Sequence, residues 1–223
     1  MFDRPDQFVL WGSAGHAKVL AEVIVMRGGK VIALFDNNGD ALSALFGVSI
    51  YVGKDGFHTW LEDIGRKKEV VSGLAAIGGG RGFDRLKIQS LFLEHGLSVP
   101  VLKHPSAVVS PSAAIGKGTQ ILALANIAAE VTLGDGCIIN HLASVDHECK
   151  VGNGVHVGPS ATLCGCVSVA DNVFVGAGAV VLPRISIGAN SIIGAGAVIT
   201  KDVSTGSILA GNPARPIRTS IPS

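Results

Sequence analysis

The chain has 223 residues, of which 48% are hydrophobic and 5% aromatic, and its formal net charge is +1. This length allows one large domain or two modest ones, and the near-neutral charge gives no electrostatic basis for binding nucleic acid or an anionic membrane. No apolar run is long enough to span a bilayer, and residues 1–5 lack the apolar core of a signal peptide, so we expect a cytoplasmic protein.

The first part of the chain alternates between apolar strand patterns and helical patterns, and the first three elements predict a βαβ unit. The expected elements are a strand over residues 7–11, a helix over 17–27, strands over 31–35 and 69–77, helices over 54–64 and 81–95, and a last strand over 99–102. We therefore predict a small Rossmann-like α/β domain with a parallel sheet over residues 1–105.

The loop after the first expected strand begins Gly12-Ser13-Ala14-Gly15. It leads into a helix, whose free backbone N–H groups and dipole favour an anion. Asp36 ends the second strand, where an acidic residue in such units often meets a ribose hydroxyl. Because the loop lacks the full G-x-G-x-x-G pattern, a nicotinamide dinucleotide site has weak support. Binding of a nucleotide or nucleotide sugar is favoured over glycines that only make a tight turn.

From residue 109 to residue 204, a Val, Ile or Leu returns every six positions, and a small or β-branched residue stands four positions after each. A period of six fits neither an amphipathic helix nor an alternating strand, but it fits a β-solenoid with one short strand and one corner per hexad. Glycines such as Gly116, Gly134 and Gly152 are expected to give the backbone freedom for the bends. A β-sandwich is disfavoured because its strand and loop lengths would vary.

All four cysteines lie inside this repeat. Cys137 and Cys149 occupy the small position, where a buried thiol acts as a compact hydrophobe. Cys164 and Cys166 form an isolated Cys-x-Cys, which is a weak metal signal. We therefore expect reduced structural thiols and no metal.

Polar residues concentrate at residues 140–149 of the repeat. His147 stands third in its hexad, directed away from the aliphatic interior, between Asp146 and Glu148. A neighbouring carboxylate can orient an imidazole and make it more basic, so His147 is a candidate general base. The alternative is a surface histidine that is only solvated.

The repeat resembles the hexapeptide-repeat acyltransferases, whose left-handed parallel β-helix completes one triangular coil in three hexads. The loop Gly-Ser-Ala-Gly-His-Ala-Lys at residues 12–18, the short α/β domain and Asp-His-Glu-Cys at residues 146–149 together resemble one subgroup. It is the NeuD/PglD-like family, which includes sialic acid O-acetyltransferases and the amino-sugar N-acetyltransferases of bacillosamine and perosamine biosynthesis. The resemblance covers nearly the whole chain and implies a left-handed β-helix acetyltransferase domain over residues 106–204 and a C-terminal tail over 205–223. Residues 211–216 are expected to be irregular and resemble the closing segment of these enzymes, which lies beside the nucleotide end of coenzyme A; on sequence alone they could equally form a polar cap over the last coil.

The resemblance also implies a reaction, which is the transfer of acetyl from acetyl-CoA to the amino group of a UDP- or GDP-linked amino sugar. His147 would be the general base, Glu148 would hold it, and the amide of Gly165, one coil later, would be the oxyanion donor. The implied assembly is a homotrimer, with acetyl-CoA between neighbouring β-helices. The implied substrate-binding residues are Gly12, Ser13, Gly15, His16, Asp36, Asn37 and Gly78, and the implied cofactor-binding residues are His156, Gly165, Ala177, Ala195 and Arg215.

Several alternatives stay open at this stage. O-acetylation of a sialic-acid-like sugar needs the same base, and a β-helix can also be a non-catalytic scaffold. A γ-carbonic-anhydrase-like enzyme would gather His141, His147 and His156 around zinc. His141 and His147 share a hexad position one side of the coil apart, but His156 falls in another register, so no common tetrahedral point is evident. Departures from the family pattern at Asp36-Asn37 and at residues 77–82 leave the choice between uridine and guanosine open.

Overall fold

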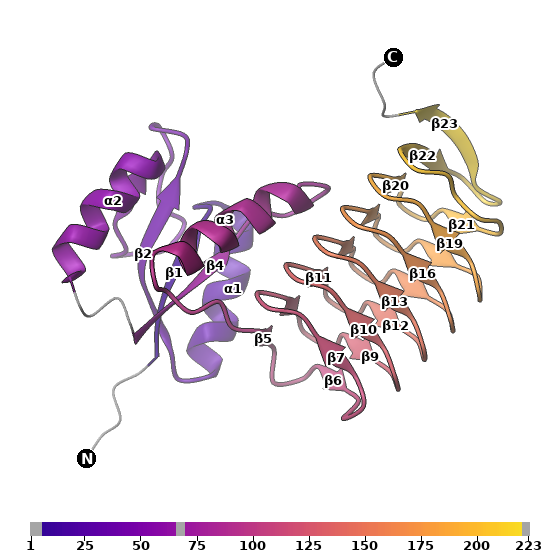
Figure 1. The fold of residues 1–223 in the computed structure, drawn as a ribbon, viewed down its shortest axis with the longest axis horizontal. Helices are drawn as coiled ribbons and strands as arrows, with labels where there is room; N and C mark the ends of the chain where they lie inside the picture. Colours follow the sequence, from indigo (N-terminus) through magenta and orange to yellow (C-terminus); the bar gives the residue numbers. More distant parts are fainter. Residues whose placement is uncertain (1–5, 66–69, 220–223) are drawn as a thin grey trace.

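The computed structural model describes residues 6–65 and 70–219, and Figure 1 shows an α/β part followed by a long stack of short strands. Residues 1–5, on which the signal-peptide argument rests, and Glu69, the first residue of one expected strand, lie outside the described residues. None of the described helices is long and apolar enough to cross a membrane.

The α/β part has one parallel sheet with the strand order β3-β2-β1-β4. Its elements are β1 (Gln7–Trp11), α1 (Gly15–Met26), β2 (Lys30–Asp36), β3 (Ile50–Val52), α2 (Gly53–Ile64), β4 (Val71–Ala75) and α3 (Gly82–Glu94). All but β3 match the expected elements to within a few residues.

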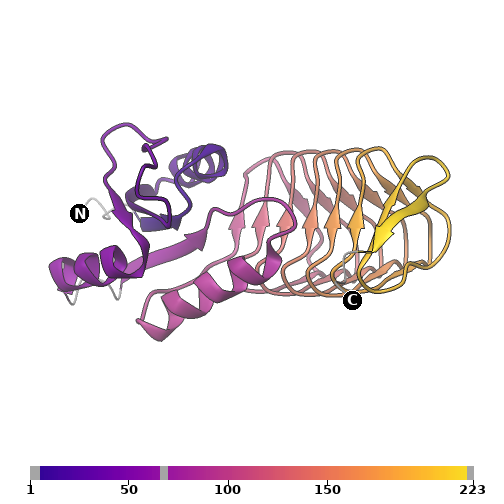
Figure 2. The ribbon, with the colours of Figure 1, turned by 90° about the horizontal axis from the view of Figure 1, so that it is seen from above.

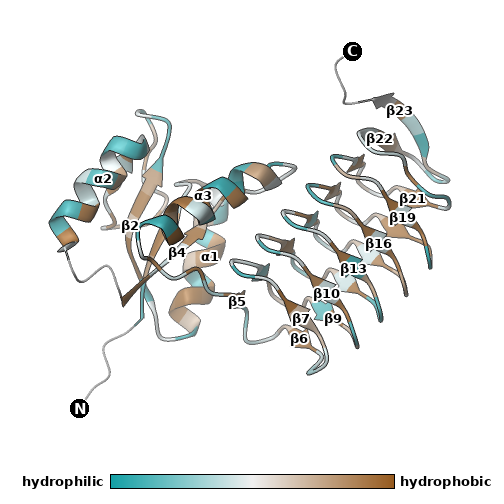
Figure 3. Cartoon of the chain, viewed as in Figure 1, coloured by the Kyte–Doolittle hydropathy of each residue, from teal (hydrophilic) through white to brown (hydrophobic). Residues whose placement is uncertain are grey.

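Helices cover both faces of this sheet, because the side chains of β1 alternate between two apolar clusters. Leu10 packs with Leu20 of α1 on one face, whereas Val9 packs with Phe57 of α2 and Phe92 of α3 on the other. All of these side chains are buried. In Figure 3 the sheet is mainly brown, whereas much of α2 is teal.

The prediction of a last strand of the α/β domain over residues 99–102 is wrong, because these residues form no strand of the α/β sheet. The structure has instead β5 (Leu102–Lys103), which pairs in parallel with β8 of the repeat. The Leu102 amide donates to the Thr119 carbonyl at 2.9 Å, and the Leu102 side chain packs with Leu122 and Ile138. Leu102 is buried and apolar, but the strand with which β5 pairs belongs to the solenoid.

The repeat forms a parallel β-helix with three sheets, in which each strand pairs with strands eighteen residues away in the chain. Three hexads therefore close one coil, and Figure 2 shows the coils stacked in a regular row. The strands are β6 (Val108–Val109), β7 (Ala114–Ile115), β8 (Gln120–Ile121), β9 (Asn126–Ile127), β10 (Thr132–Leu133), β11 (Ile138–Ile139), β12 (Ser144–Val145), β13 (Lys150–Val151), β14 (His156–Val157), β15 (Thr162–Leu163), β16 (Ser168–Val169), β17 (Phe174–Val175), β18 (Val180–Val181), β19 (Ser186–Ile187), β20 (Ile192–Ile193) and β21 (Val198–Ile199).

The interior of the solenoid is one continuous aliphatic cluster. It contains both the recurring Val, Ile or Leu and the small residue four positions later, such as Val145 and Cys149. Each buried aliphatic side chain contributes about 1.5–3 kcal/mol, so the stack of coils is stabilised along its whole length.

The expected role of the repeat glycines is wrong in one respect. Gly116, Gly134 and Gly152 do not have positive φ, and a Cβ at Gly152 would lie 2.4 Å from Asp171 Oδ1 and 2.8 Å from the Asp171 amide. These glycines therefore allow close stacking of successive coils. The left-handed backbone falls two residues later in the hexad, for example at Gly154 and at Glu148.

The C-terminal segment is not irregular, and of the two expected roles the structure shows the cap over the last coil. β22 (Ser207–Ala210) adds in parallel to β20, and β23 (Arg215–Thr219) then pairs antiparallel with β22. This hairpin covers the end of the stack that is farthest from the α/β part (Figure 1).

We predict that Gly152→Ala destabilises the protein by about 1–3 kcal/mol, because the added methyl group collides with the backbone of the next coil. Gly178→Asn is the matched control. Its Cβ meets nothing within 4 Å, its φ is +66°, and Asn172 and Asn190 already occupy the equivalent turn position. Urea unfolding of the two variants checks the prediction, and equal stability would contradict it.

Candidate active site

A cavity of about 650 Å³ opens at the carboxyl edge of the α/β sheet. Ligands of open α/β sheets bind at this edge. Six of the seven expected substrate-binding residues line it, namely Gly12, Ser13, His16, Asp36, Asn37 and Gly78. The seventh, Gly15, is the first residue of α1 and does not line the cavity. A neighbouring cavity of about 730 Å³ shares Trp11, Asn37, Ile77 and Arg81.

Gly12 is required by the backbone itself. Its φ is +115°, and a Cβ at this position would lie 2.4 Å from the Ala76 carbonyl oxygen. The Gly12 amide donates to the Phe35 carbonyl at 2.7 Å, so the loop is tied to the end of β2. Gly12 therefore makes a tight turn, and this turn forms one wall of the cavity.

Asp36 is held in place by the first loop. Its Oδ2 accepts hydrogen bonds from the Ser13 amide at 3.0 Å and the Ser13 hydroxyl at 2.6 Å, and its Oδ1 accepts from the Asn38 amide at 3.0 Å. Partial burial raises the pKa of the Asp36 carboxyl, but these hydrogen bonds outweigh it and hold the pKa below its usual value. The cavity therefore presents a fixed carboxylate.

His16 points from α1 to the solenoid. Its ring Nε2 lies 2.7 Å from Gln120 Oε1, and the Gln120 amide nitrogen donates to the Ala75 carbonyl at 2.8 Å. Burial lowers the pKa of His16, although the hydrogen bond to Gln120 raises it. Sequence reasoning missed Gln120, because nothing in its hexad marks it as a link between β8 and the end of β4.

Arg85 is the largest fully buried side chain of the structure, at 0% exposure. In the described part of the chain its hydrogen bonds all go to main-chain carbonyls, those of Ile77 (3.1 Å), Gly79 (3.2 Å), Gly136 (2.9 Å) and Gly154 (2.6 Å). Burial lowers its pKa to about 10, so the guanidinium stays charged at neutral pH. Arg85 thus fixes the glycine loop at residues 78–80 against the second and third coils.

His156 is buried between the two parts of the chain rather than open to a cofactor. Asn140 Nδ2 lies 3.0 Å from its Nε2, its Nδ1 lies 3.3 Å from the Gly79 carbonyl oxygen, and Phe174 packs against the ring. Burial, together with the charge of Arg85, lowers the pKa of His156 to about 4. These contacts fit a neutral ring that accepts from Asn140 and donates to Gly79.

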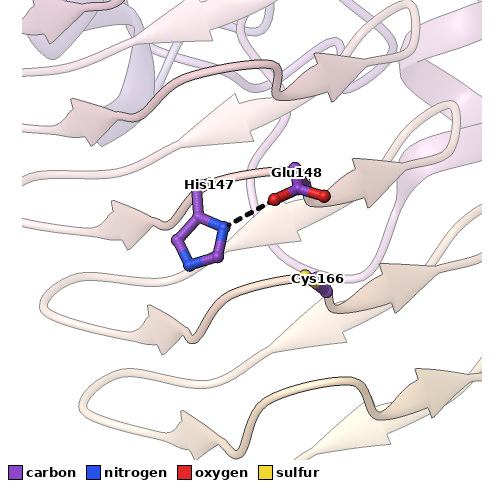
Figure 4. A group of neighbouring side chains, drawn as sticks. All are labelled: His147, Glu148 and Cys166. Carbon is purple, nitrogen blue, oxygen red and sulfur yellow. Dashed lines mark hydrogen bonds and ion pairs between the residues drawn. The ribbon is translucent and has the colours of Figure 1, made fainter.

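His147 projects outward from the corner between β12 and β13, with 52% of its side chain exposed. Figure 4 shows its Nδ1 facing Glu148, whose Oε1 lies 3.1 Å away. A proton on Nδ1 that is donated to this carboxylate leaves Nε2 free to accept another proton. Asp146 contributes differently, because its Oδ1 accepts from the His147 amide at 2.7 Å.

Gly165 lies directly against the His147 ring, as the spacing of eighteen residues predicts. A Cβ on Gly165 would stand 2.5 Å from His147 Nε2 and 2.7 Å from its Cε1. The amides on either side of Gly165 are hydrogen-bonded. The Cys164 amide donates to the Val181 carbonyl, and the Cys166 amide donates to the His147 carbonyl. Within the described residues, no acceptor is found for the Gly165 amide.

The His147 corner, made of residues 146–148 and 164–166, joins the six-stranded sheet to the five-stranded sheet. In the described part of the chain, the side-chain hydrogen bonds between the α/β part and the β-helix all fall on the eight-stranded sheet or on the turns leading into it. The structure therefore does not bring His147 to the cavity of its own chain.

The other expected cofactor-binding residues lie elsewhere. Ala177 and Ala195 are exposed and stacked on successive coils, at the corner that joins the eight-stranded sheet to the six-stranded sheet, where His141 also stands. Arg215 begins β23 and lines a cavity of about 380 Å³ together with Lys201. In one chain, none of these three residues is on the His147 corner.

The four cysteines are free thiols, as expected. Burial raises the pKa of Cys137 and of Cys149 to about 11, so both are neutral at physiological pH. Among the described residues, His141, His147 and His156 do not form a group of metal-ligand atoms. A different group does form, made of His147, Glu148 and Cys166.

A β-helix of hexapeptide repeats with an outward histidine against a bare glycine amide defines the class of hexapeptide acyltransferases. The profile described as bacterial transferase hexapeptide (six repeats) matches residues 148–182 and 166–201. No curated protein sequence matches the chain.

Solved structures extend this likeness to the whole chain. PerB from Caulobacter crescentus, in complex with CoA and GDP-perosamine, is 38% identical, and the match covers 94% of this chain and 96% of that chain with a TM-score of 0.83. The acetyltransferase domain of PglB from Neisseria gonorrhoeae FA1090, in complex with acetyl coenzyme A, is 31% identical, covering 96% of this chain and 100% of that chain with a TM-score of 0.83. WeeI from Acinetobacter baumannii AYE, at 24% identity, shares the fold, with a TM-score of 0.82 over 94% of this chain and 99% of that chain.

The chain belongs to the NeuD/PglD-like family of hexapeptide-repeat sugar acetyltransferases. The predicted fold class, a Rossmann-like α/β part followed by a left-handed parallel β-helix, is confirmed, and so is the enzyme class. The division at residues 105 and 204 stays a prediction.

We predict that His156 makes stability depend on pH. Its pKa is about 4 in the folded protein against 6.5 for an unperturbed histidine, so the unfolded chain binds the proton first. The contribution of His156 to the free energy of unfolding is therefore complete above about pH 6.5, and it is lost as the pH falls toward 4. We expect the free energy of unfolding, measured with urea at a series of pH values, to change less steeply with pH in His156→Gln than in wild type. His58→Gln, at an exposed position, is the control, and an unchanged slope in His156→Gln would contradict the prediction.

Proposed function

We propose that the protein transfers the acetyl group of acetyl-CoA to the amino group of a nucleotide-linked amino sugar. The observation that carries the proposal is the stacking of His147 on Gly165, with Glu148 on the other ring nitrogen. PerB, the relative bound to CoA and GDP-perosamine, supports this substrate class.

In this mechanism His147 is the general base. The uncharged amine of the sugar attacks the thioester carbonyl, and Nε2 takes the proton from the attacking nitrogen. Glu148 keeps the other proton on Nδ1 and stabilises the imidazolium that forms. A positioned base of this kind contributes about a hundredfold to ten-thousandfold to the rate.

The Gly165 amide is the oxyanion donor in this proposal. It is close to the ring, it has no side chain to fill the space above the base, and its N–H has no acceptor among the described residues. Such an N–H can donate a hydrogen bond to the oxygen that becomes negative in the tetrahedral intermediate. One donor of this kind raises kcat by about a hundredfold to a thousandfold. When this intermediate collapses, the CoA thiolate leaves. Cys149 is buried and neutral, so no acyl-cysteine is needed.

The proposed assembly is a homotrimer with its active sites between subunits. One chain holds the nucleotide cavity beside its eight-stranded sheet and His147 at a separate corner, so a neighbouring chain has to bring the two together. The same arrangement gives a role to Ala177 and Ala195, whose exposed backbone would face acetyl-CoA across the subunit boundary. Arg215 would meet the nucleotide end of CoA. The cytoplasmic location stays a prediction.

The cavity at the sheet edge is the proposed site for the nucleotide part of the sugar. The Gly12–Ser13 loop at the N-terminus of α1 suits the diphosphate, and the fixed Asp36 carboxylate suits a ribose hydroxyl. Asn37, His16 and Gly78 would complete the contacts.

We expect the purified protein to acetylate a UDP- or GDP-linked 4-amino sugar when it is incubated with acetyl-CoA and a panel of acceptors. Mass spectrometry of the products and release of free CoA thiol are the measurements. Acetylation of free sialic-acid-like sugars alone would replace the proposal by O-acetylation. No acetylation of any acceptor would favour a scaffold.

His147→Asn should lower kcat by about a hundredfold to ten-thousandfold, because asparagine cannot accept the proton. The melting temperature should change little, since half of the side chain is exposed. His104→Asn, a histidine of the first coil outside the site, is the matched control and should keep its kcat. Near-normal turnover of His147→Asn would remove this residue from the mechanism.

A further inference from the structure

His147, Glu148 and Cys166 form a compact group of three different ligand types. Each offers one atom, an imidazole nitrogen, a carboxylate oxygen and a thiol sulfur, and these atoms all lie within 4.8 Å of one another (Figure 4). Imidazole nitrogen, carboxylate oxygen and thiolate sulfur are each donors to Zn²⁺ in proteins, and three protein ligands with one open position are a common arrangement.

The backbone of two successive coils holds the three donors. Glu148 and Cys166 occupy the same left-handed turn position one coil apart, with φ of 58° and 61°. The Cys166 amide donates to the His147 carbonyl at 2.9 Å, and the Glu148 amide donates to the Ala129 carbonyl at 2.9 Å. The donors therefore come from rigid turns, and a metal ion can bind with small side-chain movements.

In the single chain the group is open to solvent, and in the proposed trimer it faces the cleft between subunits. The side chains of His147 and Glu148 are 52% and 58% exposed, and a cavity of about 520 Å³ beside them is lined by Glu148 and Cys166. Glu130 and Lys150 also line this cavity, and the negative charge of Glu130 offsets the positive charge of Lys150. A water molecule has room to fill a fourth coordination position.

We propose that this group is a reversible zinc site and that bound Zn²⁺ inhibits acetyl transfer. The inhibition, but not the binding, rests on the proposed role of His147. Zinc on Nε2 blocks the base directly. Zinc on Nδ1 displaces Glu148 and leaves the proton of the neutral ring on Nε2, which then cannot accept another. In either case the nitrogen next to Gly165 can no longer take a proton from the amine.

Cys166 separates zinc binding from catalysis, because it has no role in the proposed reaction. Cys166→Ser should keep the kcat of wild type and lower zinc affinity at least tenfold. The loss of a residue that only hydrogen-bonds to a zinc ligand already lowers the affinity by about tenfold or more. Cys164→Ser is the matched control. Cys164 is also partly exposed and is two residues away, but it is not in the group, so this variant should behave as wild type.

The experiment uses the full-length protein after treatment with a chelator. Calorimetric titration with Zn²⁺ should show one ion bound per chain in wild type, and Co²⁺ should give a thiolate charge-transfer band that Cys166→Ser lacks. Zinc should suppress acetylation by wild type, and a chelator should restore it.

Equal zinc affinity of wild type and Cys166→Ser, or no charge-transfer band with Co²⁺, would overturn the zinc site. If zinc binds as described but His147→Asn keeps its turnover, the binding site stands, and the proposed catalytic role of His147 fails together with the inhibition. If His147→Asn loses turnover but zinc does not bind, only the zinc proposal fails.

Discussion

The charged guanidinium of Arg85, enclosed by protein, connects the α/β part of the chain to the β-helix. Burying such a charge is unfavourable unless its N–H groups are satisfied, and here four carbonyl oxygens satisfy them. Two of these carbonyls belong to the loop beside the cavity at the sheet edge, and two belong to turns of the solenoid. The cation therefore fixes the distance between the cavity and the coils, and its charge helps to keep His156 neutral.

The geometry of the candidate active site follows from the way the coils stack. Because strands pair eighteen residues apart, any residue lies beside the one a single coil later, and His147 meets Gly165 for this reason alone. A side chain at residue 165 would occupy the place of the ring. Glu148 reaches Nδ1 from a left-handed turn, a conformation that is strained for a residue other than glycine and is held here by the hydrogen bonds of the stack.

The sequence predicts those features that repeat. A six-residue period identifies the solenoid and its buried positions. Together with the three hexads per coil that the family resemblance implies, the same period predicts that His147 lies against Gly165. Long-range contacts without a pattern cannot be found in this way. The burial of His156, the Gln120 link and the Arg85 acceptors depend on how the α/β part lies on the coils, and neither the short β3 nor the C-terminal hairpin has a periodic signal.

The C-terminal hairpin has a consequence for the solubility of the fold. A parallel β-helix ends in unpaired main-chain groups, on which another copy could add coils and grow into a filament. β23 runs against the direction of the stack, so it cannot serve as a template for the next parallel coil. Pro216 removes one donor from this outer strand, and the exposed Arg215 places a charge on it. At the other end, β5 connects the α/β part to the eight-stranded sheet, and the α/β part lies beside the first coils (Figure 1).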